Sequence, residues 1–167
     1  MKFSLVELEE LSGEKLKIYS LLIEDDELTL YDHFLEENTE NFAEETTDIT
    51  NRLEVMATRT GLRDDFIKTG EGALGDDICA LYDKPDSNLR LYFIRFGNAA
   101  IVLGGGGYKS KTIRRLQDDP KLKEENYFLR KVSAVFADAV QEGTLSITDD
   151  GLESTTDFIY TIDEDHE

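Results

Sequence analysis

The sequence predicts an α+β fold, in which a small antiparallel β-sheet has helices packed on one side. Residues 89–96 form a largely apolar run whose alternate residues are expected on opposite faces of a strand, and Gly97-Asn98 separates this run from a second apolar run at 100–103. Apolar residues then recur at helical spacing through 121–142, which predicts a long helix. A chain of 167 residues fits one such domain with added elements.

The N-terminal part is expected to extend this core with a hairpin and two helices. Apolar runs at 3–8 and 16–23 flank the turn Ser12-Gly13, which predicts a β-hairpin. The apolar residues with helical spacing are Leu28, Tyr31 and Leu35 in one segment and Phe42, Ile49, Leu53 and Met56 in the next, which ends before Gly61. The glutamates of these segments, Glu36, Glu37, Glu40, Glu44 and Glu45, are expected on solvated helix faces.

The middle of the chain predicts three strands joined by short turns. An apolar run at 78–82 precedes a turn at 85–88, and the strands at 89–96 and 100–103 complete an antiparallel meander. Four glycines follow at 104–107. Because glycine weakens a strand interior, we expect these glycines to leave the sheet as a crossing that another backbone or a ligand approaches closely.

The C-terminal part predicts one helix and two short strands. The apolar stripe of the helix is formed by Leu122, Leu129, Val132, Val135, Phe136, Ala139 and Val140. Gly143 supplies the stop of this helix, and strands are expected at 145–148 and 158–162 across a turn at 149–151.

These elements predict the domain organisation. The expected units are a single α+β domain at 1–143, containing a core at 66–143 and an N-terminal elaboration at 1–65, and an acidic C-terminal extension at 144–167.

Charge is distributed unevenly along the chain. The net charge is −19, yet residues 104–131 hold eight basic and four acidic side chains. A cationic segment on an acidic background indicates a site that meets an anion or an acidic part of the same protein. The overall acidity disfavours extensive binding to nucleic acid, because phosphate contacts require positive charge.

Several site classes are not expected. Cys79 is the single cysteine and lies in an apolar run, so we expect a buried core residue. His33 and His166 are far apart in the sequence, so neither a histidine-based active site nor a metal site is predicted, and no cofactor is expected. No apolar run approaches the ~20 residues of a membrane span and no signal peptide is visible, which predicts a cytoplasmic protein.

The glycine run does not match a nucleotide-binding motif. A Walker loop requires Gly-Lys-Ser/Thr without interruption, and Tyr108 interrupts it here. A dinucleotide fingerprint requires a third glycine at position 109, which is lysine.

The order of strand, two-stranded hairpin, glycines, Lys-x-Lys and helix resembles the RelE/ParE toxin superfamily, especially its HigB-like, phage-associated branch. The matching motifs are Lys68-Thr69-Gly70-Glu71-Gly72-Ala73-Leu74, Leu89-Arg90-Leu91-Tyr92-Phe93-Ile94-Arg95 and Gly107-Tyr108-Lys109-Ser110-Lys111-Thr112. The resemblance covers about 66–118. It departs from the family pattern at 80–82, where the sequence Ala-Leu-Tyr lacks the arginine of the family motif.

This resemblance implies a toxin-like component of a type II toxin–antitoxin module. Such a protein acts as a metal-independent mRNA endonuclease at the ribosome and pairs with a small helix-turn-helix antitoxin. Cleavage by attack of the 2′-hydroxyl requires stabilisation of the phosphorane and proton transfer, and Lys, Arg and Tyr side chains supply both. The residues that the resemblance assigns to catalysis are Arg95, Tyr108, Lys109 and Lys111. Those assigned to RNA binding are Tyr92, as a stacking platform, and Arg114 and Arg115, at neighbouring phosphates.

Each of these residues has an alternative structural role. Arg95 is explained by a salt bridge to an acidic residue of the N-terminal helices, and Tyr92 by packing in the sheet. Lys109 and Lys111 are explained as solvated residues of an extended strand, and Arg114 and Arg115 by pairing with Asp118 and Asp119. The alternative function is a non-catalytic acidic interaction or regulatory protein, including a decoy that mimics nucleic acid, which the net charge favours.

Overall fold

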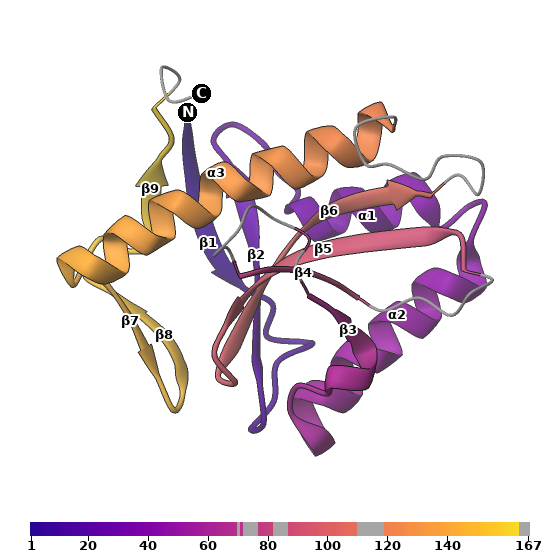
Figure 1. Cartoon of the computed structure of the whole chain (residues 1–167), viewed down its shortest axis with the longest axis horizontal. Helices are drawn as coiled ribbons and strands as arrows, with labels where there is room; N and C mark the ends of the chain where they lie inside the picture. Colours follow the sequence, from indigo (N-terminus) through magenta and orange to yellow (C-terminus); the bar gives the residue numbers. More distant parts are fainter. Residues whose placement is uncertain (70, 72–76, 82–86, 110–118, 164–167) are drawn as a thin grey trace.

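The computed structural model describes residues 1–69, 71, 77–81, 87–109 and 119–163, and within them the fold is α+β, as predicted (Figure 1). The strands are β1 (Lys2–Glu7), β2 (Lys17–Ile23), β3 (Ile67–Lys68), β4 (Ile78–Leu81), β5 (Leu89–Phe96), β6 (Ala100–Tyr108), β7 (Leu145–Thr148), β8 (Gly151–Ser154) and β9 (Ile159–Thr161). The helices are α1 (Leu30–Asn38), α2 (Ala43–Val55) and α3 (Pro120–Glu142), with a π-helical turn η1 (Met56–Thr60) and a 3-10 turn η2 (Asp64–Phe66).

Seven strands form the main sheet in the order β3-β4-β5-β6-β2-β1-β9. The predicted N-terminal hairpin is confirmed by antiparallel pairing of β1 with β2, and the predicted meander by antiparallel pairing of β4, β5 and β6. The sheet is nevertheless mixed, because β2 and β6 are parallel, with Ile18 opposite Ile101. A parallel pair requires a long crossover, and the segment from α1 to β5 supplies it. The predicted turn at 85–88 lies partly outside the described residues.

Helices cover both faces of the sheet, so the prediction of helices on one side was wrong. Figure 1 shows α3 across one face, with α1 and α2 on the other. The reason lies in strands such as β5, where Leu91 and Phe93 pack on the α1 and α2 side while Tyr92 and Ile94 pack on the α3 side. A strand that is apolar on both faces must be covered on both.

The glycine run continues β6 instead of leaving the sheet, which corrects the prediction. Gly104 to Gly107 are buried within β6, and this part of the strand pairs with the start of β5. The expected close approach is confirmed: a Cβ atom at Gly104 would lie 3.0 Å from the Leu129 side chain of α3, and one at Gly106 would overlap the main-chain oxygen of Arg90. The pairing of β5 with β6 shifts register beside these glycines. Glycine is required at Gly104 and Gly106 because a side chain there would collide with α3 or with β5.

Helix α3 is stabilised by defined ends and a buried stripe. The Asp119 carboxylate accepts a hydrogen bond from the Leu122 N–H (3.1 Å), and Gly143 ends the helix in a left-handed conformation, as predicted. Phe136 is buried together with Leu122, Leu129, Val132 and Ala139, while Val135 is partly buried. Val140 was predicted in the stripe but is 41% exposed, because Ala139 takes the core position in the last turn.

The C-terminal segment forms a separate two-stranded sheet from β7 and β8 and adds β9 to the main sheet. The turn after β7 leads to β8, which pairs with β7, and β9 then pairs with β1 at the sheet edge. The prediction that 145–148 and 158–162 face each other across the turn was therefore wrong. Tyr160 is buried against Phe3 and Phe136, so this segment contributes to the core.

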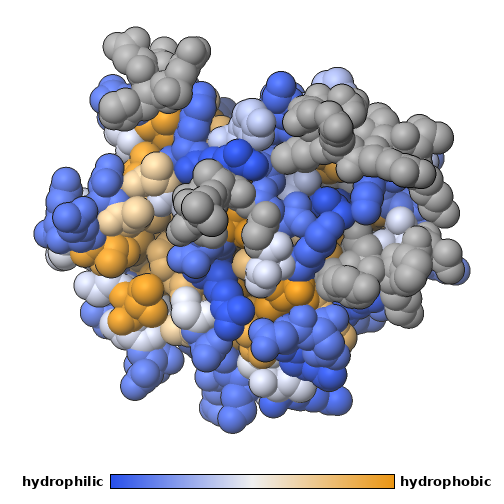
Figure 2. Space-filling view, in the orientation of Figure 1, coloured by the Kyte–Doolittle hydropathy of each residue, from blue (hydrophilic) through white to orange (hydrophobic). Residues whose placement is uncertain are grey.

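Most of the surface seen in Figure 2 is hydrophilic, with hydrophobic side chains in patches between polar ones. Cys79 is buried, as expected. None of the described helices is sufficiently long and apolar to span a lipid bilayer.

Candidate functional site

Tyr92 lies in the core and is not available as a stacking platform. Its exposed fraction is 0%, and its ring packs in the core on the α3 side of the sheet. Burial raises the pKa of Tyr92 to about 12. Tyr92 is therefore a tyrosine that packs in the sheet, which was the alternative interpretation of this residue.

Arg95 lies at the far end of β5 and on the other face of the sheet. Its guanidinium donates hydrogen bonds to the Gly97 carbonyl oxygen (2.8 Å) and to Asn98 Oδ1 (2.7 Å), and it lies 3.8 Å from the Asp64 carboxylate. Asp64 lies in the 3-10 turn η2, beyond the two N-terminal helices from which the alternative interpretation took the acidic partner. Two of the guanidinium's nitrogen atoms therefore donate to the hairpin turn between β5 and β6.

The structure does not bring Arg95 together with Tyr108 and Lys109. Arg95 is opposite Ile101, whereas Tyr108 is opposite Leu89 at the other end of the hairpin. Seven residues of strand separate Ile101 from Tyr108, which corresponds to roughly 23 Å. The remaining predicted site residues, Lys111, Arg114 and Arg115, lie outside the described residues.

Tyr108 marks the end of β6 and is half exposed. Its ring stacks on Phe42, with 5.7 Å between ring centroids and 11° between ring planes. The next residue, Lys109, donates its main-chain N–H to the Asn88 carbonyl oxygen (2.6 Å). The sheet end is thus held against the start of α2.

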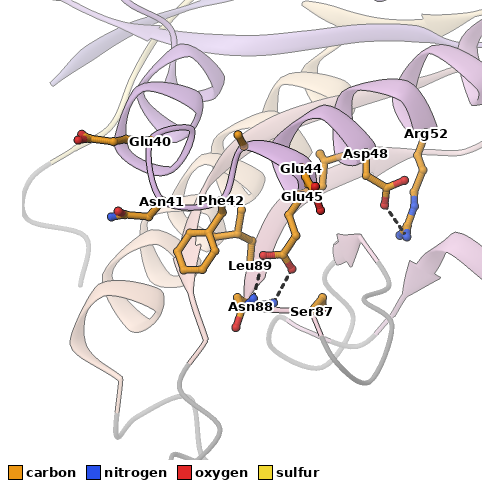
Figure 3. Close-up of a pocket in the computed structure, with 12 residues that line it drawn as sticks. Glu40, Asn41, Phe42, Glu44, Glu45, Asp48, Arg52, Ser87, Asn88 and Leu89 are labelled. Atoms are coloured by element: carbon orange, nitrogen blue, oxygen red, sulfur yellow. Dashed lines mark hydrogen bonds and ion pairs between the residues drawn. The ribbon is translucent and has the colours of Figure 1, made fainter.

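A groove of about 660 Å³ opens beside this aromatic pair, between the first half of α2 and the segment that leads into β5 (Figure 3). The groove is lined by Glu40, Asn41, Phe42, Ala43, Glu44, Glu45, Asp48, Ile49, Arg52, Ser87, Asn88 and Leu89. Four of these side chains are carboxylates and one is a guanidinium. We call this feature the acidic groove.

Two contacts define the walls of the acidic groove. The Glu45 carboxylate accepts hydrogen bonds from the Asn88 N–H (2.5 Å) and from Asn88 Nδ2 (3.1 Å), and the Asp48 carboxylate lies 2.8 Å from the Arg52 guanidinium (Figure 3). Glu40 and Glu44 are exposed. Ser87 adds a buried hydroxyl oxygen for which the described residues provide no hydrogen-bond partner.

The sequence of α2 explains why acidic residues gather here. Phe42 precedes the helix and provides no side-chain cap, while Glu44 and Glu45 lie in the first turn. Negative charge in the first turn of a helix interacts favourably with its dipole. Helix stability therefore accounts for part of this acidity, but not for Glu40 or Asp48, which lie outside the first turn.

Phe42, Glu45 and Asn88 were not predicted as site residues. Glu45 was interpreted as solvated, and its contact with Asn88 spans 43 residues of sequence, which local patterns do not reveal. One available signal was Phe42, an aromatic residue among acidic ones at a helix start.

Within the described ranges, no group of three or more His, Cys, Asp or Glu side chains is placed to hold a metal ion. Comparisons of the chain with family models, with curated proteins and with solved structures find no match.

Proposed function

We propose that this chain is a non-catalytic cytoplasmic interaction protein whose acidic groove binds a basic segment of a partner protein. The observation that carries the proposal is the groove itself, which combines four carboxylates with an apolar wall. Its volume, about 660 Å³, lies within the range of roughly 300–1,000 Å³ that is typical of binding sites.

The chemistry of the groove fits a segment that carries both basic and apolar residues. Glu44 and Asp48 are exposed, so they meet Lys or Arg side chains without disturbing the core. Phe42 and Leu89 provide apolar contact area beside them. Complementary charge of this kind increases association rate and specificity.

The same groove disfavours nucleic acid. Phosphates placed there would approach Glu40, Glu44 and Asp48, while Arg52 is paired with Asp48. A DNA-binding partner, by contrast, carries the basic residues that the groove favours. The helix-turn-helix antitoxin expected from the resemblance is a partner of that kind.

Peptide binding tests the proposal. A fluorescein-labelled peptide that alternates Lys and Leu is titrated with the protein and compared with one that alternates Glu and Leu. We expect the basic peptide to bind at least about tenfold more tightly, and the variant Glu44→Gln/Asp48→Asn to weaken it at least about threefold. The control Glu124→Gln/Asp138→Asn removes the same charge from exposed positions of α3. If both double variants lose the same affinity for the basic peptide, the peptide is attracted only by the total charge of the protein, and the proposal that the groove binds it is refuted.

A second candidate, the toxin-like endoribonuclease, is favoured by one observation. Tyr108 is 48% exposed at the end of β6, directly before Lys109 and the cationic part of the sequence. The order β4, β5, β6 and α3 also supports it, since this is the element order on which the resemblance rests.

Inducible expression tests this second candidate. An active toxin arrests growth and cleaves mRNA on translating ribosomes, and Lys109→Glu abolishes both effects. Lys131→Glu, at an exposed position of α3, makes the same charge change and leaves them intact. Growth without arrest and without cleavage would exclude the endoribonuclease.

A further inference from the structure

A group of polar side chains lies between α3 and the sheet, on the face away from α1 and α2. Its members are Glu71, Arg90, Tyr92, Asn126 and Arg130, and we call them the polar cluster. Tyr92 and Asn126 are 0% exposed, and the side chains of Glu71 and Arg90 are 11% and 12% exposed. Such depth is unusual for charged residues in a protein of this size.

The contacts of the polar cluster converge on Glu71. Asn126 Nδ2 donates to the Glu71 carbonyl oxygen (2.9 Å), and Arg130 donates to the same oxygen over 3.4 Å. The Glu71 carboxylate lies 3.5 Å from the Arg90 guanidinium and 3.4 Å from Lys68 Nζ. Both guanidinium contacts are long for hydrogen bonds to oxygen, so neither arginine is fully satisfied by Glu71.

Four polar atoms of the cluster are buried with no hydrogen-bond partner among the described residues. They are Arg90 Nε, Arg130 Nε, Tyr92 Oη and Asn126 Oδ1. Buried polar groups in folded proteins are almost always hydrogen-bonded, so a concentration of unpartnered atoms in one place requires an explanation. Three of the four can donate a hydrogen bond, and two of these belong to permanently charged guanidinium groups.

The charges around the cluster are positive in sum. Lys68, Arg90 and Arg130 are cations, while Glu71 and Asp119 are the anions, and Asp119 also caps α3. Lys68 is half exposed, so within the cluster itself the two guanidinium groups face the carboxylates of Glu71 and Asp119. Water would satisfy the unpartnered atoms, and an oxyanion would in addition form charge-assisted hydrogen bonds with the two guanidinium groups, which Glu71 contacts only over long distances.

We propose that the polar cluster binds a phosphate-type oxyanion, either free phosphate or a phosphate monoester. Arg90, Arg130 and the Tyr92 hydroxyl donate hydrogen bonds to the anion, and Asn126 Oδ1 accepts one from a protonated oxygen of it. Guanidinium groups suit this ligand because their fixed planar donors match the geometry of phosphate oxygens. The site is separate from the acidic groove and does not depend on the function proposed for that groove.

Calorimetric titration with inorganic phosphate, at constant ionic strength in chloride buffer, tests the site. We expect one saturable site in the wild-type protein and in Lys131→Gln, and at least about tenfold weaker binding in Arg130→Gln. Lys131 is the matched control, because it is adjacent on α3, exposed and equally charged. A second titration uses adenosine 5′-monophosphate. If Arg130→Gln weakens its binding as it weakens that of phosphate, the ligand is a phosphate ester.

Tyr92→Phe keeps the test decisive if Arg130→Gln does not fold. This variant removes one hydroxyl, which lies beside the Arg90 guanidinium, and keeps the ring that packs in the core, so it should remain folded in chloride. It should also bind phosphate at least about threefold more weakly. No saturable binding of phosphate or nucleotide to the wild type, or equal binding by Arg130→Gln and Lys131→Gln, would overturn the proposal.

Discussion

Glu45 of α2 accepts two hydrogen bonds from Asn88, one from its main-chain N–H and one from its side-chain amide. This contact joins the start of the second helix to the start of β5 and forms one wall of the acidic groove. Because Lys109 donates to the carbonyl oxygen of the same asparagine, Asn88 also holds the end of β6. The groove is therefore positioned by the residues that fix the end of the sheet.

Removal of the Glu45 carboxylate should destabilise the protein. Hydrogen bonds to a charged group contribute about 1.5–3 kcal/mol, so Glu45→Ala should lower the free energy of unfolding by about 1–3 kcal/mol. Glu44→Ala, its exposed neighbour, should change it by less than about 0.5 kcal/mol. Urea titration followed by circular dichroism measures both. Equal losses would show that the contact with Asn88 contributes nothing.

The glycines of β6 should differ in their tolerance of a methyl group. At Gly106 a Cβ atom would overlap the main-chain oxygen of Arg90, which cannot move without breaking strand pairing, so Gly106→Ala should cost about 1–3 kcal/mol. At Gly107 the nearest atom is Cγ of the flexible Lys121 side chain, at 3.3 Å, so Gly107→Ala should cost less. Thermal unfolding of the two variants compares them. A Gly107 variant that is less stable than the Gly106 variant would contradict the placement of these glycines in β6.

Phe136 should be the dominant anchor of α3. Its ring contacts Phe3, Phe96 and Tyr160, and it is 1% exposed, so Phe136→Ala should cost about 3–5 kcal/mol. Val140→Ala, one turn later and 41% exposed, should cost less than about 1 kcal/mol. A loss below about 1 kcal/mol for Phe136→Ala in denaturant titration would show that α3 is peripheral to the core.

Two buried tyrosines should make the protein sensitive to alkaline pH. Burial raises the pKa of Tyr31 and of Tyr92 to about 12, from an ordinary value of 10. The folded state therefore retains the phenolic protons that the unfolded chain releases. The resulting stability is complete below pH 10 and is lost as the pH rises from 10 to 12.

Each tyrosine should account for about 1–3 kcal/mol of this loss. Tyr92→Phe should reduce the decrease in the free energy of unfolding between pH 9 and pH 12. Tyr127→Phe, at a position that is 41% exposed, serves as the control. If the two variants lose stability in parallel with the wild type, Tyr92 ionises as readily in the folded as in the unfolded state.

The sequence predicted the elements better than their arrangement. The helix at 121–142 and the strands at 89–96 were recognised because each has its own periodicity and its own end signals, including Gly143 and Gly97-Asn98. The parallel pairing of β2 with β6 joins segments more than 80 residues apart, for which no local pattern exists. Coverage of both sheet faces was visible in principle, since Leu91, Tyr92, Phe93 and Ile94 form an unbroken apolar run.

The candidate site was harder to predict. Hairpin geometry alone separates Arg95, near the turn, from Tyr108, at the open end, so their distance could have been inferred from the turn at Gly97-Asn98. The acidic groove could not have been inferred from the sequence. It depends on contacts that only the folded chain creates, such as those of Phe42 with Tyr108 and of Glu45 with Asn88.

Binding of a basic segment in the acidic groove is tested most directly by a ¹⁵N-HSQC titration with the peptide that alternates Lys and Leu. We expect the amide signals of Phe42, Glu44, Glu45, Asp48 and Asn88 to shift most and to saturate together. Shifts concentrated on the exposed face of α3, around Glu124 and Asp138, or scattered over all acidic surfaces without saturation, would contradict it.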